Sequence, residues 1–152
     1  MIPLETDAPD FKLKDQNGTE VHLADLRDKK VLLSFHPLAW TRVCADQMKS
    51  LEANHERFKE MNAVALGISI DSAPSKNAWA KELGIQETQL LADFWPHGEI
   101  ASLYEIFRHK DGFSERANII LDEKQRVVFA RTYPLSHLPD IDELIEFMDK
   151  KM

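Results

Sequence analysis

The stretch KVLLSFHPLAWTRVCADQM, residues 30–48, combines a strand signal with a helix signal. Its first six residues form a short apolar run, which is typical of strands that are covered on both faces of a parallel sheet. From Cys44 onward, apolar or partly apolar residues recur at steps of three and four, namely Met48, Leu51, His55 and Phe58. The stretch therefore predicts a buried strand that leads into a helix of about four turns, with the only cysteine of the chain at the helix start.

The segment before this stretch predicts a β-hairpin. FKLKDQNGTEVHL, residues 11–23, has alternating apolar positions on each side of Asn17-Gly18. Asn-Gly favours a tight turn in which both central residues have positive φ. We therefore expect the hairpin to be an N-terminal extension of the fold.

The chain after residue 60 repeats the alternation of strands and helices. AVALGISI, residues 63–70, predicts a second buried strand, and SAPSKNAWAKELG predicts a helix with Pro74 in its first turn and Gly84 as its stop. A short apolar pair, Leu90-Leu91, precedes a shorter helix expected over residues 99–107. Residues 116–133 then predict two strands about a turn, and residues 138–152 an amphipathic closing helix.

This order of elements indicates an α/β fold with a central mixed sheet flanked by helices. Strands that alternate with helices favour a mainly parallel sheet with helices on both faces, and the two late strands add antiparallel pairing at one side. The order resembles the thioredoxin-like fold with an N-terminal β-hairpin extension. A chain of 152 residues is expected to form a single domain, residues 1–152.

Composition and charge exclude several classes of function. The chain has 19 basic and 26 acidic residues, a net charge of -7, and no basic patch, which disfavours binding to nucleic acid or to an anionic membrane. No segment approaches the roughly 20 apolar residues of a membrane span, and the N-terminus lacks a signal-peptide pattern. One cysteine cannot form an internal disulfide. We therefore expect a cytoplasmic protein.

No cofactor is expected from the sequence. The six histidines show no H-x-x-x-H pair, and no Cys/His cluster has metal-ligand spacing. The five glycines do not cluster into a phosphate-binding loop. The sequence accordingly predicts neither a metal nor an organic cofactor.

The position of Cys44 suits a nucleophile. In the first turn of a helix, a thiol lies among unpaired backbone N–H groups and near the positive end of the helix dipole, and both favour the thiolate. The alternative is that Cys44 packs as a small buried side chain, as most cysteines do. Position alone leaves both interpretations open.

The neighbours of Cys44 form a more specific pattern. Pro37, Thr41 and Cys44 have the spacing P-x-x-x-T-x-x-C, which resembles the active-site signature of the peroxiredoxin family (alkyl hydroperoxide reductase / thiol-specific antioxidant). The resemblance implies that Cys44 is the peroxidatic cysteine, that Thr41 binds peroxide and thiolate through its hydroxyl, and that Pro37 shields the pocket. It also implies that Arg116, six residues before Asp122 in RANIILD, holds the thiolate and the peroxide.

Each of these assignments has an alternative. Thr41 could be an ordinary helix cap, and Pro37 could simply end the strand. Arg116 could be a surface arginine beside Glu115. The sequence also departs from the family at Gln47, because relatives often carry an acid there. We expect Gln47, together with His36, to act in a supporting layer around the site.

The single cysteine places the chain among one-Cys members. Lys49 stands where many relatives have a resolving cysteine, so a sulfenic acid on Cys44 must be reduced by an external thiol or by a thioredoxin- or glutaredoxin-like protein. FHPLAWTRVC and DFWPHGEIASLYEIF are similar to the alkyl hydroperoxide reductase E subgroup. Members of that group commonly form homodimers, which makes three aromatic residues interface candidates, with core packing as the alternative for each: Trp40, Trp79 and Phe94.

The sequence thus predicts a thiol-dependent peroxidase that reduces hydrogen peroxide, organic hydroperoxides or peroxynitrite at Cys44. A peroxide-sensing relay protein that passes oxidation to a partner is the alternative, because the same site serves both. A disulfide oxidoreductase is disfavoured, since no C-x-x-C motif is present.

Overall fold

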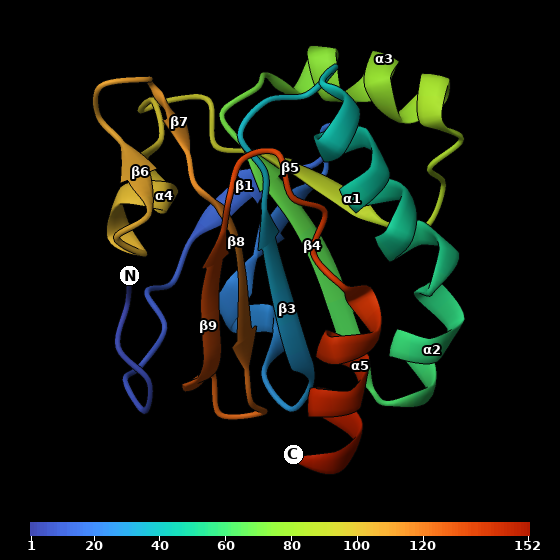
Figure 1. Cartoon of the computed structure of the whole chain (residues 1–152), viewed down its shortest axis with the longest axis vertical. Coiled ribbons are helices and arrows are strands. Elements are labelled where there is room, and N and C mark those ends of the chain that lie inside the picture. The colour runs from blue at the N-terminus through green and yellow to red at the C-terminus, as the bar shows by residue number, and fades with distance from the viewer.

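The buried strand β3 (Lys30–Phe35) lies near the middle of a seven-stranded mixed sheet in the computed structural model, which describes all 152 residues (Figure 1). The strand order is β2-β1-β5-β4-β3-β8-β9. Strands β3, β4 and β5 run parallel, whereas β8 pairs with β3, and β9 with β8, in antiparallel fashion. The remaining bounds are β1 Lys12–Lys14, β2 Glu20–His22, β4 Ala63–Ser69, β5 Gln89–Ala92, β8 Arg116–Leu121 and β9 Val127–Tyr133.

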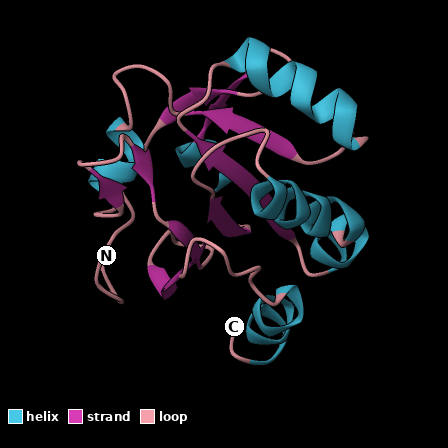
Figure 2. Ribbon diagram, turned by 45° about the horizontal axis from the view of Figure 1, so that its top comes forward, coloured by secondary structure: helices cyan, strands magenta, loops and turns pink.

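Two hydrophobic layers cover the two faces of this sheet. Because side chains alternate along a strand, Leu32 packs with the four longer helices while Val31 and Leu33 pack on the opposite face. Figure 2 shows the longer helices gathered on one side of the strands. They are α1 Arg42–Ala53, α2 His55–Glu60, α3 Ala73–Leu83 and α5 Ile141–Lys150. The other face is covered by the N-terminal segment, a 3-10 turn (η1, Leu23–Leu26) and α4 (Glu99–Leu103).

A glycine on β4 allows α1 to pack closely on the sheet. A Cβ atom at Gly67 would overlap the Sδ atom of Met48 and would lie 3.0 Å from Leu90 Cδ2. Met48 is fully buried on α1, one turn after Cys44. Glycine at this position therefore helps to set the distance between the sheet and the helix that carries the thiol.

The helix predicted from Cys44 to Phe58 is two helices. The interruption falls at Asn54, which has φ −106° and ψ 13°. Its side-chain Nδ2 donates to Ser50 O at 2.8 Å and so competes with the helix for a backbone carbonyl. The short helix α2 then restarts at His55.

The N-terminal hairpin is confirmed, but its turn differs from the expected one. Strands β1 and β2 pair antiparallel, with Lys14 opposite Glu20. Only Gly18 has positive φ, and the backbone N–H groups of Asn17 and Thr19 donate to the Asp15 carboxylate instead. Because this carboxylate closes a longer loop, a two-residue turn was the wrong prediction.

The region 89–115 holds structure that the sequence did not reveal. Leu90 and Leu91 belong to β5, a strand too short for its periodicity to be read. The helix expected over residues 99–107 ends at Leu103, because Glu105 takes a left-handed conformation with φ 60°. A two-stranded hairpin follows, formed by β6 (Phe107–Arg108) and β7 (Phe113–Ser114).

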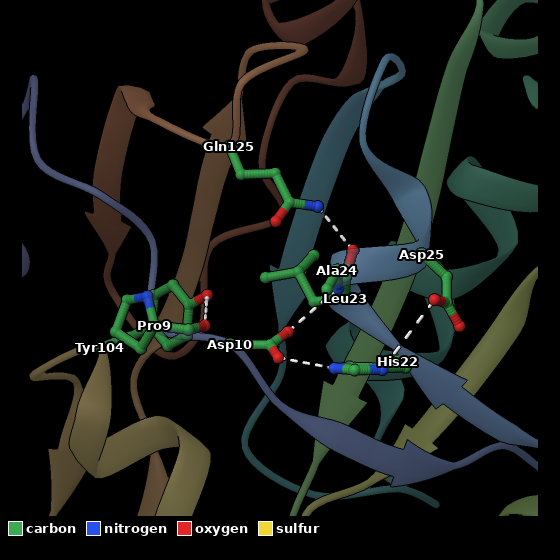
Figure 3. A network of polar contacts seen from close by, with 8 residues as sticks. All are labelled: Pro9, Asp10, His22, Leu23, Ala24, Asp25, Tyr104 and Gln125. Carbon is green, nitrogen blue, oxygen red and sulfur yellow. Dashed lines mark hydrogen bonds and ion pairs between the residues drawn. The ribbon is translucent and has the colours of Figure 1, made fainter.

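Polar contacts fasten the N-terminal segment to the end of α4 and to the turn between β8 and β9 (Figure 3). Tyr104 donates its hydroxyl proton to Pro9 O at 2.7 Å, and the Asp10 carboxylate accepts from Ala24 N at 3.0 Å. Gln125, in the turn between β8 and β9, donates from Nε2 to Leu23 O at 2.5 Å. These bonds satisfy backbone groups that irregular segments would otherwise leave without a partner in the protein.

Candidate active site

Cys44 is the third residue of α1 and is completely buried. The loop from β3 to α1 delivers it there, and two contacts hold that loop. Ala39 N donates to Asp71 Oδ2 at 2.8 Å, and Trp40 Nε1 donates to Ser75 Oγ at 3.1 Å. Trp40 itself has φ 69°, a left-handed conformation that is uncommon for a bulky residue. The sulfur therefore lies at the carboxyl end of the parallel strands, beside a helix N-terminus.

Arg116 contacts the thiol directly. It begins β8 and is only 3% exposed. Its Nη1 lies 3.4 Å from Cys44 Sγ. Nε and Nη2 donate to Leu135 O at 3.3 and 2.8 Å, so the guanidinium is held on more than one side. The alternative of a surface arginine is wrong, and the arrangement leaves a fixed positive charge against the sulfur.

Gln47 supports Arg116 from α1. Its Oε1 accepts from Arg116 Nη1 at 2.7 Å, and its Nε2 donates to Ser34 Oγ at 2.7 Å and to Phe35 O at 3.2 Å. Gln47 is 2% exposed. An amide suits this place because one end must accept from a guanidinium while the other must donate to a carbonyl.

Thr41 and Pro37 line the entrance to the thiol. Thr41 is the residue before α1, yet its side chain caps no helix N–H group, since the hydroxyl donates to Leu38 O at 2.7 Å. A cavity of about 260 Å³ is lined by Thr41, Pro37, Cys44 and Arg116 together with Phe113 and Leu135. All four residues that the family resemblance placed in the catalytic site thus meet around one cavity.

His36 lies beside the site but contacts a different residue. Its Nε2 is 3.1 Å from Lys76 Nζ, and its Nδ1 is 3.5 Å from Ser34 O. Burial, together with the nearby charge of Lys76, holds the pKa of His36 well below its usual range. His36 is therefore neutral in this setting, and the lysine is its main polar partner.

Lys76 is a site residue that sequence reasoning missed. It lies on α3 and is completely buried. Burial lowers the pKa of Lys76 to about 7, although the charges of Asp71, Cys44 and Asp93 oppose that fall. Helical spacing was a usable signal, because Lys76 falls on the same face as the buried Trp79 and Ala80.

The three interface candidates have different surroundings. Trp40 and Phe94 are 55% and 52% exposed, as an interface would require of the isolated chain. Trp79 is 1% exposed, and its ring centroid lies 5.5 Å from that of His36. Trp79 is a core residue, and its assignment to an interface was wrong because α3 turns this side chain toward the sheet. Trp95, which the prediction did not include, is 80% exposed.

Groups of acidic, histidine and cysteine side chains do not converge as they would around a metal ion. None of the helices has the length and apolar character needed to cross a bilayer. The chemistry that the site can supply comes from a thiol, a guanidinium, a hydroxyl and backbone N–H groups.

Comparisons with known proteins agree with this geometry. The family model described as AhpC/TSA family matches residues 4–130. The chain is 36% identical over 131 residues to alkyl hydroperoxide reductase E of Mycobacterium tuberculosis, covering 86% of this chain and 85% of the relative. It is 32% identical over 143 residues to peroxiredoxin 2 of Picrophilus torridus, covering 91% and 70%. The reduced 2-Cys peroxiredoxin of Plasmodium vivax matches with a TM-score of 0.88 and 28% identity, covering 96% and 80%.

The chain therefore belongs to the AhpC/TSA family. The resemblance to peroxiredoxins is confirmed, as is the expected thioredoxin-like α/β fold. The prediction that the chain is an oxidoreductase of the peroxidase class is also confirmed.

Proposed function

We propose that this protein is a one-Cys thiol peroxidase in which Cys44 reduces hydrogen peroxide, organic hydroperoxides or peroxynitrite. The observation that carries the proposal is the contact between Arg116 Nη1 and Cys44 Sγ, 3.4 Å long, in a cavity lined also by Thr41 and Pro37. The Cys44 thiolate attacks one peroxide oxygen, an S–O bond forms and the O–O bond breaks. The leaving oxygen departs with the electron pair: it takes up a proton to give water from hydrogen peroxide or an alcohol from an organic hydroperoxide, and it leaves as nitrite from peroxynitrite. Cys44 is left as a sulfenic acid.

Ionisation of the thiol supplies only part of the rate. A free cysteine with a pKa near 8.5 is roughly 3% ionised at pH 7, so complete ionisation gains at most about thirtyfold, or about 2 kcal/mol of barrier. Donors placed where charge develops on the leaving oxygen must supply the rest. Arg116, Thr41 and the backbone N–H of Cys44 are the groups at hand. In α1, the first backbone N–H that donates to a carbonyl four residues earlier is that of Ala45, which donates to Thr41 O at 2.9 Å. The N–H of Cys44 comes one residue before this first helical hydrogen bond.

The sulfenic acid returns to the thiol through an external reductant. Cys44 is the only cysteine, so no second thiol of the same chain can form a disulfide with it. A thiol from another molecule attacks the sulfenic sulfur, releases water and forms a mixed disulfide. A second external thiol then releases Cys44 and leaves an external disulfide. The reductant is a small thiol or a thioredoxin- or glutaredoxin-like protein, which fits a reducing compartment such as the cytoplasm.

The exposed aromatic residues support a homodimer. Phe94 and Trp95 line a surface cavity of about 570 Å³ together with Pro74 of α3. Trp40 contacts Ser75 of the same helix. Exposed apolar surface of this kind is typical of an interface. Sedimentation analysis of the wild-type chain and of Trp95→Glu tests this, because a dimer through this surface should dissociate in the variant, and an unchanged mass would contradict it.

The experiment that tests the peroxidase is stopped-flow oxidation of the reduced protein, followed by tryptophan fluorescence. Each of the three peroxide classes is mixed in turn with the wild-type protein and with Cys44→Ser as the control. Candidate thiols are then added, and the mixed disulfide on Cys44 is identified by mass. A rate no greater than that of free cysteine at the same pH would refute the peroxidase.

A relay protein that senses peroxide is the second candidate, favoured by the same solitary cysteine. The two functions differ in turnover. With excess small thiol, a peroxidase consumes many equivalents of peroxide per chain, whereas a relay is oxidised once and waits for its partner protein.

A further inference from the structure

Lys76 is an unusual residue in this fold. Its side chain is completely buried, and the hydrogen bond to His36 Nε2, 3.1 Å long, is the contact made by its Nζ. No carboxylate oxygen lies within ion-pair distance of it. A buried ammonium without a close counter-ion costs several kcal/mol, so its retention needs a reason.

The surroundings of Lys76 lead to the catalytic thiol. Trp79 lies one helical turn after Lys76 on α3. Trp79 and Cys44 belong to the same hydrophobic layer over the sheet. Figure 1 shows α3 and α1 side by side on that face. His36, the hydrogen-bond partner of Lys76, directly precedes Pro37, which lines the thiol cavity. The positive charge of Arg116 also lowers the pKa of His36.

We propose that Lys76 is a positioning residue, which holds His36 in place and adds a second buried positive charge, beside that of Arg116, in favour of the Cys44 thiolate. Neither the helix N-terminus nor the family motif requires such a residue. The proposal deepens the proposed peroxidase function and rests on it, since it assigns a task at the same thiol.

The charges around Lys76 act in the direction that the proposal needs. The ionisable groups that face it are His36 after β3, Asp71 after β4, Cys44 on α1 and Asp93 after β5. The negative charges among them favour the ammonium form. Because coupling between two ionisable groups is reciprocal, an ammonium that a thiolate stabilises must stabilise that thiolate equally.

The hydrogen bond to His36 has a structural consequence as well. If Lys76 Nζ donates to Nε2, the neutral imidazole carries its proton on Nδ1, where it faces Ser34 O at 3.5 Å. Ser34 also accepts, through Oγ, from the Gln47 amide that holds Arg116. Lys76 is thereby connected to the guanidinium through a short series of polar contacts.

Alkylation of Cys44 by iodoacetamide across pH tests the charge without any peroxide. In Lys76→Met, which keeps the length of the side chain and removes its charge, we expect alkylation at pH 6 to slow about fivefold. At high pH, where the thiol is fully ionised, the rates of variant and wild type should agree within twofold. The control is Lys81→Met, an exposed lysine on the same helix, which should match the wild type throughout.

A purely structural role predicts a different result, namely an alkylation profile with an unchanged midpoint. That outcome would overturn the proposal. Failure of the peroxidase itself would instead appear as slow oxidation by peroxide with the alkylation shift intact, so the two ideas fail separately.

A second measurement applies if Lys76→Met does not fold. Wild-type protein with ¹³C-labelled lysines is titrated by NMR, alongside Cys44→Ser. We expect the midpoint of the buried Lys76 signal to fall in Cys44→Ser, because the thiolate that favours the ammonium is gone. Equal midpoints in the two proteins would overturn the proposal.

Discussion

The Arg116 guanidinium lies 3.4 Å from the Cys44 sulfur, although the two residues are 72 positions apart in the chain. Strand pairing brings them together. Strand β8 lies antiparallel to β3 with Ala117 opposite Phe35, which places Arg116 at the end of β3 where the loop toward Cys44 begins. The site is thus built across two neighbouring strands of one sheet, and its geometry depends on their register.

Removal of the Arg116 guanidinium should slow peroxide reduction more than a hundredfold in Arg116→Ala, because the variant loses both the charge beside the thiolate and a donor to the leaving oxygen. Arg116→Lys should recover part of the rate, since one ammonium cannot contact Cys44, Gln47 and Leu135 together. Stopped-flow rates with hydrogen peroxide measure this. Arg57→Ala, an exposed arginine, serves as control. A rate for Arg116→Ala within threefold of wild type would refute the assignment.

Loss of the Thr41 hydroxyl in Thr41→Val should lower the rate of peroxide reduction about tenfold to a hundredfold, because the side chain keeps its shape but can no longer accept from peroxide. Thr41→Ser retains the hydroxyl and should stay within about threefold. The same stopped-flow assay separates them. Equal rates for Thr41→Val and the wild type would contradict a role of Thr41 in peroxide reduction and would leave its hydroxyl only the structural hydrogen bond to Leu38 O.

An acid in place of Gln47 is expected to slow the reaction of Cys44. In Gln47→Glu the side chain cannot donate to Phe35 O, which Nε2 now contacts at 3.2 Å. Its negative charge also competes with the thiolate for Arg116. Alkylation at pH 6 should therefore fall about threefold or more. Gln47→Met, which is uncharged, is the control, and an increase in rate for Gln47→Glu would contradict this account.

Gly67→Ala should destabilise the protein by about 1–3 kcal/mol, because the added methyl group overlaps Met48 in a packed core. Urea unfolding measures the loss. The double variant with Met48→Ala should lose less than the sum of the two single changes, since the shortened side chain leaves room for the methyl group. Strict additivity would show that the overlap is not the cause.

Asp93 should give stability an unusual dependence on pH. Burial raises the pKa of Asp93 from 3.8 to about 6, although its carboxylate accepts from Ile100 N and Ala101 N, both at 3.0 Å. The folded protein therefore binds the proton more tightly than the unfolded chain. The stability that this proton contributes is complete below about pH 4 and is lost as pH rises through 6.

The control for this effect is Asp93→Asn, which cannot ionise. The free energy of unfolding of the wild type minus that of the variant should fall by about 2 kcal/mol between pH 4 and pH 7. Urea unfolding at a series of pH values measures the difference. A constant difference across this range would contradict the raised pKa.

Several parts of the site could be predicted from the chain because they are local. The strand that ends at Phe35, the loop with Pro37 and the first turn of α1 with Cys44 follow one another within 10 residues, so spacing and periodicity report them directly. The succession of the longer strands and helices along the chain could be anticipated for the same reason. Short elements escaped, since β5, β6 and β7 have four, two and two residues and show no period.

Contacts between distant residues could not be read from the chain. The exposed interface candidate Trp40 and the buried Trp79 are the same type of residue, and only the tertiary structure, in which α3 packs against the sheet, separated them. The same packing buried Lys76 beside His36, where the sequence offered an ordinary charged helix residue.

By itself, the sequence determined that the chain has one cysteine, which motif surrounds it and that no second thiol of the same chain is present, because these depend on which residues are present and on their local spacing. Tertiary structure alone decided that Arg116 contacts Cys44, that Gln47 orients it and that Lys76 is buried nearby. The physical reason is that charge acts through space. Only the register of β8 on β3 and the docking of α3 determine which charges lie within a few ångströms of the sulfur.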